Sequence, residues 1–309
     1  MEVKVHKAAM RTTVQDLGRR GFLSQGVPIG GAMDPFALRV ANLMVGNGEN
    51  APGLEILLSG PELEFGRDCW IAACGARFEN IPAWRPLRVA AGERIRFGER
   101  IEGCRCYLAI SGGIRADRVL GGAGTYLRGG FGGFHGRALR DGDVLVVADA
   151  LRVPTDHWGI DERMLPKYSK EGLVRVVEGS HAADFGDNFY AGRYRVTPRS
   201  DRMGIRLEGH RLERSAAAQL LSSAVAPGTV QVPPDGDPIV LMADAQTLGG
   251  YPRAAHVVTV DLPLMAQLAP GDWMRFAKIG LAEAHGILKT QHRQLGLLRQ
   301  GVAAKMRSA

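Results

Sequence analysis

The stretch Ala90-Ala-Gly-Glu-Arg-Ile-Arg-Phe97 joins a glycine turn to a short run in which apolar and polar residues alternate. Such a run predicts a β-strand with one buried face. Two related stretches follow later in the chain, Arg140-Asp-Gly-Asp-Val-Leu-Val-Val147 and Ala269-Pro-Gly-Asp-Trp-Met-Arg-Phe276. This repetition indicates turn-and-strand building blocks of a barrel.

Further apolar runs between glycine and proline turns extend the pattern along the chain. They are Leu54–Leu58, Leu63–Phe65, Trp70–Ala73, Tyr107–Ile110, Val174–Val177, Ile239–Met242 and His256–Val260. The spacing of these runs is typical of an all-β fold. The sequence therefore predicts a mainly β protein.

Two segments have the pattern of helices instead. Asp34 followed by Pro35 supplies an N-cap and a first-turn proline, and Gly46 ends an apolar stripe. A second helix is expected over 281–299, where leucines recur at helical spacing. This C-terminal stripe is suited to docking on the chain itself or on a partner.

Length and composition limit the class of protein. At 309 residues the chain exceeds the usual size of one core, so two domains are expected, with 151–170 as the connection. The mean hydropathy of -0.07 and 23% charged residues are typical of globular proteins. No apolar run is long enough to span a bilayer, and residues 1–10 lack the pattern of a signal peptide. We expect a cytoplasmic protein without a membrane partner.

The charge of +7 does not by itself predict a nucleic-acid partner. The basic residues are scattered singly, without a block or a stripe interleaved with aromatic residues. The four cysteines, Cys69, Cys74, Cys104 and Cys106, lie in runs that resemble strands rather than metal-binding knuckles. We expect reduced core cysteines and no metal site.

The densest glycine segment is Tyr126-Leu-Arg-Gly-Gly-Phe-Gly-Gly-Phe-His-Gly-Arg137. Its glycines let backbone N–H groups converge on an oxyanion, and Arg128 offers fork geometry for a carboxylate. The candidates for substrate binding here are Arg128, Gly130, Gly132 and Gly133. The alternative is a tight β-turn in a barrel wall.

Two polar segments in the second half supply further candidates. Thr197-Pro-Arg-Ser-Asp-Arg-Met-Gly204 contains Ser200 and Arg202, and residues 230–253 contain Gln231 and Gln246. We assign these four side chains to substrate binding. The catalytic candidates are Asp235 or Asp244 as a base and Tyr251 as a donor. Each also has a structural explanation, because Asp235-Gly236 is an ordinary turn, Asp244 follows a strand and Ser200-Asp201 suits a turn cap.

Other catalytic patterns are absent from the sequence. It has no Gly-X-Ser-X-Gly elbow, no His-Glu-X-X-His, no Met-Lys-Met for biotin attachment and no recognisable ATP-cradling loop.

At the candidate residues the chain resembles the allophanate hydrolase subunit 2 family. Relatives in this family include KipA, the C subunit of 5-oxoprolinase, and the carboxyltransferase region of urea carboxylase and urea amidolyase. The matching segments include Thr13-Val-Gln-Asp-Leu-Gly-Arg19, Gly31-Ala-Met-Asp34, Leu54-Glu-Ile56, Thr125-Tyr-Leu-Arg-Gly-Gly-Phe-Gly-Gly-Phe134, Ser200-Asp-Arg-Met-Gly204, Gln231-Val-Pro-Pro-Asp-Gly236, Leu241-Met-Ala-Asp244 and Gly249-Gly-Tyr-Pro252. They run in order over nearly the whole chain.

The resemblance implies tandem cyclophilin-like β-barrels with a few short helices and a C-terminal helix. We expect one barrel region over 1–155, a second over 156–280, and a helix with its tail over 281–309. The resemblance also implies two protein partners, one similar to allophanate hydrolase subunit 1, or KipI, and one of the LamB/YcsF type. We expect Arg128 and Arg202 to lie near one anionic pocket with Gln231 and Tyr251.

Three functions fit the resemblance. The first is that of the C subunit in a heteromeric ATP-dependent 5-oxoprolinase, inactive alone and without a covalently bound cofactor. The second is that of a biotin-dependent carboxyltransferase which acts on urea or another small amide, with carboxybiotin on a separate carrier. The third is that of a KipA-like regulatory protein which sequesters a kinase inhibitor. We expect the 5-oxoprolinase function.

Three positions depart from the family pattern. Asp201 stands where asparagine is common, Ala245 where arginine is common, and Leu248 where threonine is common. Losing a guanidinium and a hydroxyl from one loop is expected to alter substrate choice or catalysis.

Overall fold

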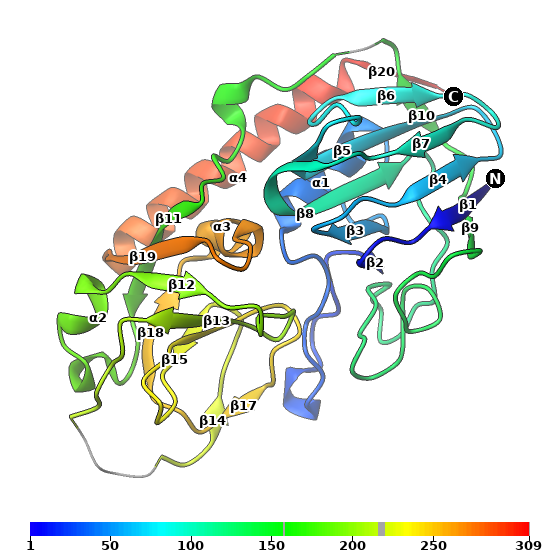
Figure 1. Ribbon diagram of the computed structural model, residues 1–309. Helices are drawn as coiled ribbons and strands as arrows, with labels where there is room; N and C mark the ends of the chain where they lie inside the picture. Colours follow the sequence, from blue (N-terminus) through cyan, green and yellow to red (C-terminus); the bar gives the residue numbers. More distant parts are fainter. Residues whose placement is uncertain (157, 216–219, 309) are drawn as a thin grey trace. The chain divides into compact units, whose positions relative to one another are not determined.

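The computed structural model describes residues 1–156, 158–215 and 220–308 (Figure 1). The chain divides into two compact units. The first contains residues 1–20, 30–167 and 294–309, and the second contains residues 21–29 and 168–293. The expected boundaries at 155 and 280 stay predictions.

The first unit is built around two antiparallel sheets. One has the order β2-β3-β8-β5-β6 and the other the order β7-β4-β1-β9. The strands of the five-stranded sheet are β2 (Arg11–Gln15), β3 (Gly53–Leu57), β8 (Arg100–Ile110), β5 (Cys69–Phe78) and β6 (Pro86–Val89). Those of the four-stranded sheet are β7 (Arg94–Arg96), β4 (Glu62–Phe65), β1 (Glu2–Lys7) and β9 (Val144–Val146). Apolar side chains from both sheets form one core, including Val3, Phe65, Ile56, Cys106 and Leu108.

Helix α1 (Pro35–Met44) belongs to the first unit and begins as the sequence predicts. Asp34 is the N-cap, and its side chain accepts a hydrogen bond from the backbone N–H of Ala37 at 2.9 Å. Pro35 takes the first helical position, where a missing N–H costs nothing. A short ribbon in the same unit pairs β10 (Arg152–Pro154) with β20 (Met306–Ser308).

The second unit contains a closed barrel of seven strands (Figure 1). Around the ring these are β11 (Glu171–Glu178), β18 (Arg253–Val257), β15 (Thr229–Gln231), β16 (Ile239–Leu241), β13 (Gly204–Gly209), β12 (Tyr194–Val196) and β19 (Trp273–Lys278). The ring closes through a parallel pairing of β11 with β19. Alternate residues are buried, such as Val174 and Val176 on β11 and Met274 and Phe276 on β19.

The remaining described elements are helices, a short ribbon and 3₁₀ turns. Helices α2 (Asn188–Ala191) and α3 (Leu262–Gln267) are short, and β14 (Ser223–Ala224) pairs with β17 (Leu248–Gly249) in a separate ribbon. Helix α4 (Leu281–Ala303) follows β19, and Ala284 near its start packs against Val258 and Val260. Four 3₁₀ turns complete the described elements, at Leu23–Gln25, Glu162–Met164, Ala182–Asp184 and Thr259–Asp261.

The structure confirms a mainly β protein with few helices and a C-terminal helix. All three glycine-turn stretches form strands, β7, β9 and β19. One local expectation was wrong. The run His256–Val260 leaves the sheet at Val257, because the chain turns into the 3₁₀ helix Thr259–Asp261. The segment 151–170 stays the predicted connection, and it contains β10, which pairs with the distant β20.

The four cysteines are buried and form no disulfides. Cys69 and Cys74 lie on β5, and Cys104 and Cys106 on β8, as their apolar flanks predicted. Burial raises the pKa of the Cys69 and Cys106 thiols to about 12, so the thiol form dominates at neutral pH. Within the described residues, no helix is long and apolar enough to cross a membrane.

Candidate functional site

A hollow of about 780 Å³ lies in the second unit. Its lining mixes charged groups of both signs with apolar surface: Arg211, Leu212, Glu213, Arg214, Leu220, Val232, Pro233, Pro234, Asp235, Gly250, Tyr251 and Pro252. This size and lining suit a small ligand with polar ends. Two of the predicted catalytic residues, Asp235 and Tyr251, lie here.

Asp235 is an exposed carboxylate at this hollow. Its Oδ1 accepts a hydrogen bond from the backbone N–H of Asp237 at 3.2 Å, as expected for the predicted turn. Burial raises the pKa of the neighbouring Asp237, and the negative charge of Asp235 adds to this shift. Tyr251 is 46% exposed. Both side chains are therefore accessible to a ligand.

Gln231 and Gln246 contact each other. Gln231 ends β15 and is 1% exposed, and its Oε1 accepts a hydrogen bond from Nε2 of Gln246 at 3.3 Å. Val232, the next residue, lines the hollow. The structure thus brings four of the predicted residues, Gln231, Asp235, Gln246 and Tyr251, to one region of the second unit.

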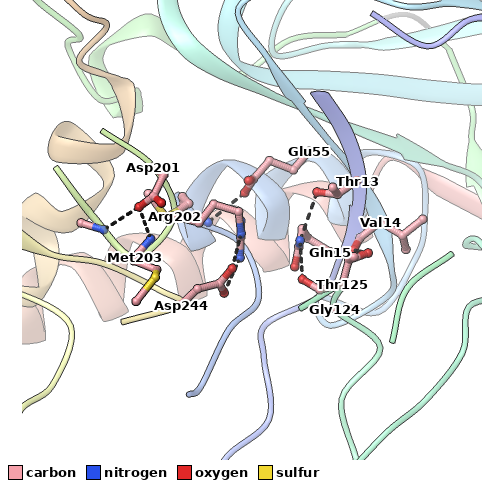
Figure 2. A network of polar contacts seen from close by, with 12 residues as sticks. Thr13, Val14, Gln15, Glu55, Gly124, Thr125, Asp201, Arg202, Met203 and Asp244 are labelled. Atoms are coloured by element: carbon pink, nitrogen blue, oxygen red, sulfur yellow. Dashed lines mark hydrogen bonds and ion pairs between the residues drawn. The ribbon is translucent and has the colours of Figure 1, made fainter. Parts of the chain in front are cut away.

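Arg202 and Asp244 form a buried ion pair (Figure 2). The Arg202 Nε and Nη2 atoms donate to the two carboxylate oxygens at 2.8 and 3.0 Å, and each side chain is 6% exposed. Bidentate pairing of this kind fixes the plane of the guanidinium. Both oxygens of Asp244 accept from Arg202. Asp244 is therefore better suited to hold the Arg202 guanidinium in place than to act as a base.

The turn that contains Arg202 is held by side chains of the turn itself. Asp201 Oδ1 accepts from the backbone N–H groups of Met203 and Gly204, at 2.8 and 3.2 Å. The Ser200 hydroxyl accepts from the Arg206 N–H at 3.0 Å and donates to the Arg206 carbonyl at 3.3 Å. These contacts give Ser200 a structural role beside its predicted one.

The glycine-rich loop belongs to the first unit and folds on itself. The N–H groups of Gly130 and Gly133 donate to the carbonyls of Tyr126 and Asp117, at 2.9 and 3.1 Å. Gly130, Gly132 and Gly133 all have positive φ. A Cβ at Gly133 would overlap Thr125 Oγ1, whereas one at Gly130 would meet open space. The loop is therefore a tight turn in which these two amide groups already have acceptors. Arg128 is exposed on it.

A second polar cluster in the first unit was not among the predicted site residues. Glu55 lies on β3 and is buried, and its Oε2 accepts from the Tyr107 hydroxyl at 2.7 Å and from the Met33 N–H at 3.0 Å. The Tyr107 hydroxyl in turn accepts from the Asp34 N–H at 2.8 Å. Burial raises the pKa of Tyr107 well above its ordinary value, and Glu55 adds to this. The sequence feature that could have identified this cluster is a glutamate inside the otherwise apolar run Leu54–Leu58.

The segment 13–19 also makes buried polar contacts in the first unit (Figure 2). Gln15 Nε2 donates to Thr13 Oγ1 and to the Thr125 carbonyl, each at 3.1 Å. Asp16 Oδ2 accepts from the Ala123 N–H at 2.6 Å. The contact of Gln15 with Thr125 joins two matching segments of the family resemblance, 13–19 and 125–134.

The described residues contain no group of three His, Cys, Asp or Glu side chains placed to hold a metal ion. The occupied amides of the glycine loop also fit poorly with a phosphate cradle, because Gly130 and Gly136 donate to carbonyls within the loop and Gly133 donates to the Asp117 carbonyl. The observed geometry suits a small polar ligand at the rim of a barrel.

The fold defines a mainly β, barrel-containing protein, and its second unit has a hollow with charged and apolar lining. The chain belongs to the family "Carboxyltransferase domain, subdomain A and B", whose model matches residues 25–278.

Individual relatives are similar over nearly the whole chain. The C subunit of 5-oxoprolinase from Escherichia coli (strain K12) is 39% identical over 94% of this chain and 96% of that protein. The urea amidolyase of Lachancea kluyveri is 32% identical over 94% of this chain, which corresponds to 18% of that protein. The crystal structure of Kluyveromyces lactis urea carboxylase matches 99% of this chain and 30% of its own, with a TM-score of 0.89 and 28% identity.

Proposed function

We propose that this chain is the C subunit of a heteromeric, ATP-dependent 5-oxoprolinase. The observation that carries the proposal is the 39% identity to the corresponding E. coli protein, which extends over 96% of that protein. Its partners in the proposal are a KipI-like protein and a LamB/YcsF-like protein. The urea amidolyases, in contrast, have most of their length outside the matched region.

The hollow in the second unit supports a substrate of this kind. The proposed substrate, 5-oxoproline, is a small ring with a lactam carbonyl and a carboxylate. Arg211 suits the carboxylate, because a guanidinium binds it with two parallel hydrogen bonds. Asp235 and Tyr251 supply an accessible carboxylate and a phenol for proton transfer. We place substrate binding on this chain and ATP use on the complex.

The test is reconstitution of the complex from its three separately purified proteins. ATP-dependent formation of glutamate from 5-oxoproline is measured for each protein and for the mixture, and we expect activity in the mixture alone. Asp235→Asn should lower kcat by about a hundredfold, whereas Asp201→Asn restores the common family residue and should keep activity. A mixture that forms the complex and hydrolyses no 5-oxoproline would refute the proposal.

The carboxyltransferase alternative has its own support in the family model and in the TM-score of 0.89 to urea carboxylase. In that case carboxybiotin is carried on another chain, and the substrate is urea or another small amide. Transfer of labelled carboxylate from a biotin carrier to urea by the same purified complex would favour this function over oxoproline hydrolysis.

A further inference from the structure

The outer face of β11 and β19 is partly open to solvent. The two strands pair in parallel, with Glu171 opposite Trp273 and Leu173 opposite Arg275. Successive side chains of a strand point to opposite faces of the sheet, and Met274, between two of these residues, is buried in the barrel. The four side chains therefore point outward. Leu173 is 62% exposed, although it is apolar.

A hollow of about 340 Å³ lies among these four residues, and Arg193 also lines it. The guanidinium carbon of Arg193 lies over the Trp273 ring, 4.4 Å from its centroid. The same guanidinium forms an ion pair with the Glu171 carboxylate. The cation–π contact and the ion pair together favour one orientation of Arg193. This part of the hollow is therefore already arranged before anything binds.

Arg275 carries a positive charge at the hollow that its surroundings do not balance. Two other arginines of this face have carboxylate partners, since Arg193 pairs with Glu171 and Arg195 pairs with Glu208. In the described part of the chain, Arg275 forms no ion pair. A guanidinium binds a carboxylate with two parallel hydrogen bonds. Beside an exposed apolar side chain, this charge suits an occupant that combines an apolar group with a carboxylate.

The hollow favours a protein over a small molecule or a nucleic acid. Its volume is near the lower end of the range for small-molecule sites, about 300–1,000 Å³, and such sites bury most of the ligand. Glu171, Leu173 and Arg275 are all exposed, so a small molecule held here would stay in contact with solvent. A nucleic acid would meet the Glu171 carboxylate, and Arg193 covers one face of the Trp273 ring on which a base would stack. Tryptophan and arginine are, in contrast, enriched at protein interfaces.

We propose that the outer face of β11 and β19 binds a protein partner that places an apolar side chain between Leu173 and Trp273 and an aspartate or glutamate carboxylate on Arg275. The barrel is closed, so its strands offer this partner side chains and no free edge for an added strand. That the partner is one of the two other proteins of the 5-oxoprolinase complex rests on the proposed function.

The experiment measures binding by calorimetric titration of this chain with the KipI-like protein and, separately, with the LamB/YcsF-like protein. Leu173→Asn removes the apolar contact, and Arg275→Glu reverses the charge. We expect each change to weaken binding of the protein that wild type binds by about tenfold or more. The melting temperature should stay that of wild type, because both side chains are exposed.

Two matched variants are the controls. Ile101→Asn replaces an apolar residue of β8 that is 50% exposed, and Arg206→Glu reverses the charge of an exposed arginine on β13. Both should keep wild-type affinity. Wild-type affinity in Leu173→Asn and Arg275→Glu, or an equal loss of affinity in the controls, would overturn the docking surface. A fall in melting temperature that parallels the loss of binding would overturn it as well.

Turnover by the mixture of three proteins separates this surface from the proposed function. Hydrolysis of 5-oxoproline by complexes that form equally well with Leu173→Asn and Arg275→Glu would support the function and overturn the surface. Binding that both variants weaken, in a complex without hydrolysis, would support the surface and refute the function. If neither protein binds wild type, both claims fall. Binding of an RNA oligonucleotide that Arg275→Glu weakens, with protein binding unchanged, would overturn the choice of a protein partner.

Discussion

At the scale of single residues, Arg202 and Asp244 form a buried ion pair between two candidate segments of the second unit. The two side chains are 42 residues apart in the sequence and are 6% exposed. A buried ion pair is costly to break, because one charge loses its partner in a medium of low dielectric constant. Removing both partners together avoids this cost.

We predict that Asp244→Leu alone lowers the free energy of unfolding by about 3 kcal/mol. The double variant Arg202→Met, Asp244→Leu should recover most of that loss, because neither charge of the pair is left without the other. Urea unfolding of wild type, both single variants and the double variant gives the coupling free energy. Additive losses in the double variant would show that the pair has no such coupling.

His256 gives the second unit a pH-dependent contribution to stability. Burial lowers the pKa of this histidine below its ordinary value of 6.5, and the charge of Arg253 adds to the shift. The unfolded chain therefore takes up the proton first as the pH falls. The contribution is complete above about pH 6.5 and is lost progressively below it.

We predict that wild type loses more stability than His256→Asn between pH 7.5 and pH 5.5. The free energy of unfolding at both pH values, measured for both proteins by chemical denaturation, tests this difference. His292→Asn, which changes an exposed histidine of α4, is the control. Equal losses in wild type and His256→Asn would contradict the assignment.

At the scale of elements, the glycine-rich loop shows which glycines the backbone requires. Gly130 and Gly133 have similar positive φ values, 66° and 63°. They differ in their surroundings, because a Cβ would meet open space at Gly130 and Thr125 Oγ1 at Gly133. Comparing an alanine substitution at each position therefore separates the cost of backbone strain from the cost of steric overlap.

We predict that Gly130→Ala costs about 1 kcal/mol of unfolding free energy, the usual cost of a left-handed alanine. Gly133→Ala should cost about 3 kcal/mol, because overlap adds to the same strain. Thermal and urea unfolding of the two variants check the difference. Equal losses would indicate that Thr125 moves aside without cost.

The elements also show which parts of the fold could be predicted from the sequence. Helix α1 was predictable because Asp34, Pro35 and Gly46 are local signals at its two ends. The strands β14, β15 and β17 were not singled out, since each has only two or three residues and depends on pairing with distant segments. Glu55 was missed for the same reason, because its contact with Tyr107 depends on the pairing of two strands that are distant in sequence.

At the scale of the whole chain, its last residues pack in the first unit with much earlier segments. Strand β20 pairs with β10, and the Lys305 carbonyl accepts from the N–H and the hydroxyl of Thr155, at 2.9 and 3.0 Å. Arg299 on α4 donates to Glu49 at 2.7 Å, across 250 residues of sequence. The C-terminal segment thus contributes to the structure of this unit.

We predict that a chain ending at Ala303 loses on the order of 2 kcal/mol of stability, because β10 loses its partner strand. The variant Leu297→Ser changes an exposed position of α4 and should unfold like wild type. Differential scanning calorimetry of the three proteins makes the comparison. An unchanged transition after truncation would mean that β20 adds nothing to the unit.

The sequence by itself determined the mainly β class, the ends of α1, the burial of the cysteines and, through ordered motifs, the family. All of these depend on residues close together in the chain, because turn residues and the alternation of apolar and polar residues determine local structure. The tertiary structure alone decided that β11 closes the barrel against β19, that Arg202 binds Asp244, and that Gln231 Nε2 is buried without an acceptor among the described residues. Each of these depends on strand register over tens of residues, and register is set by packing and backbone pairing that no local pattern specifies.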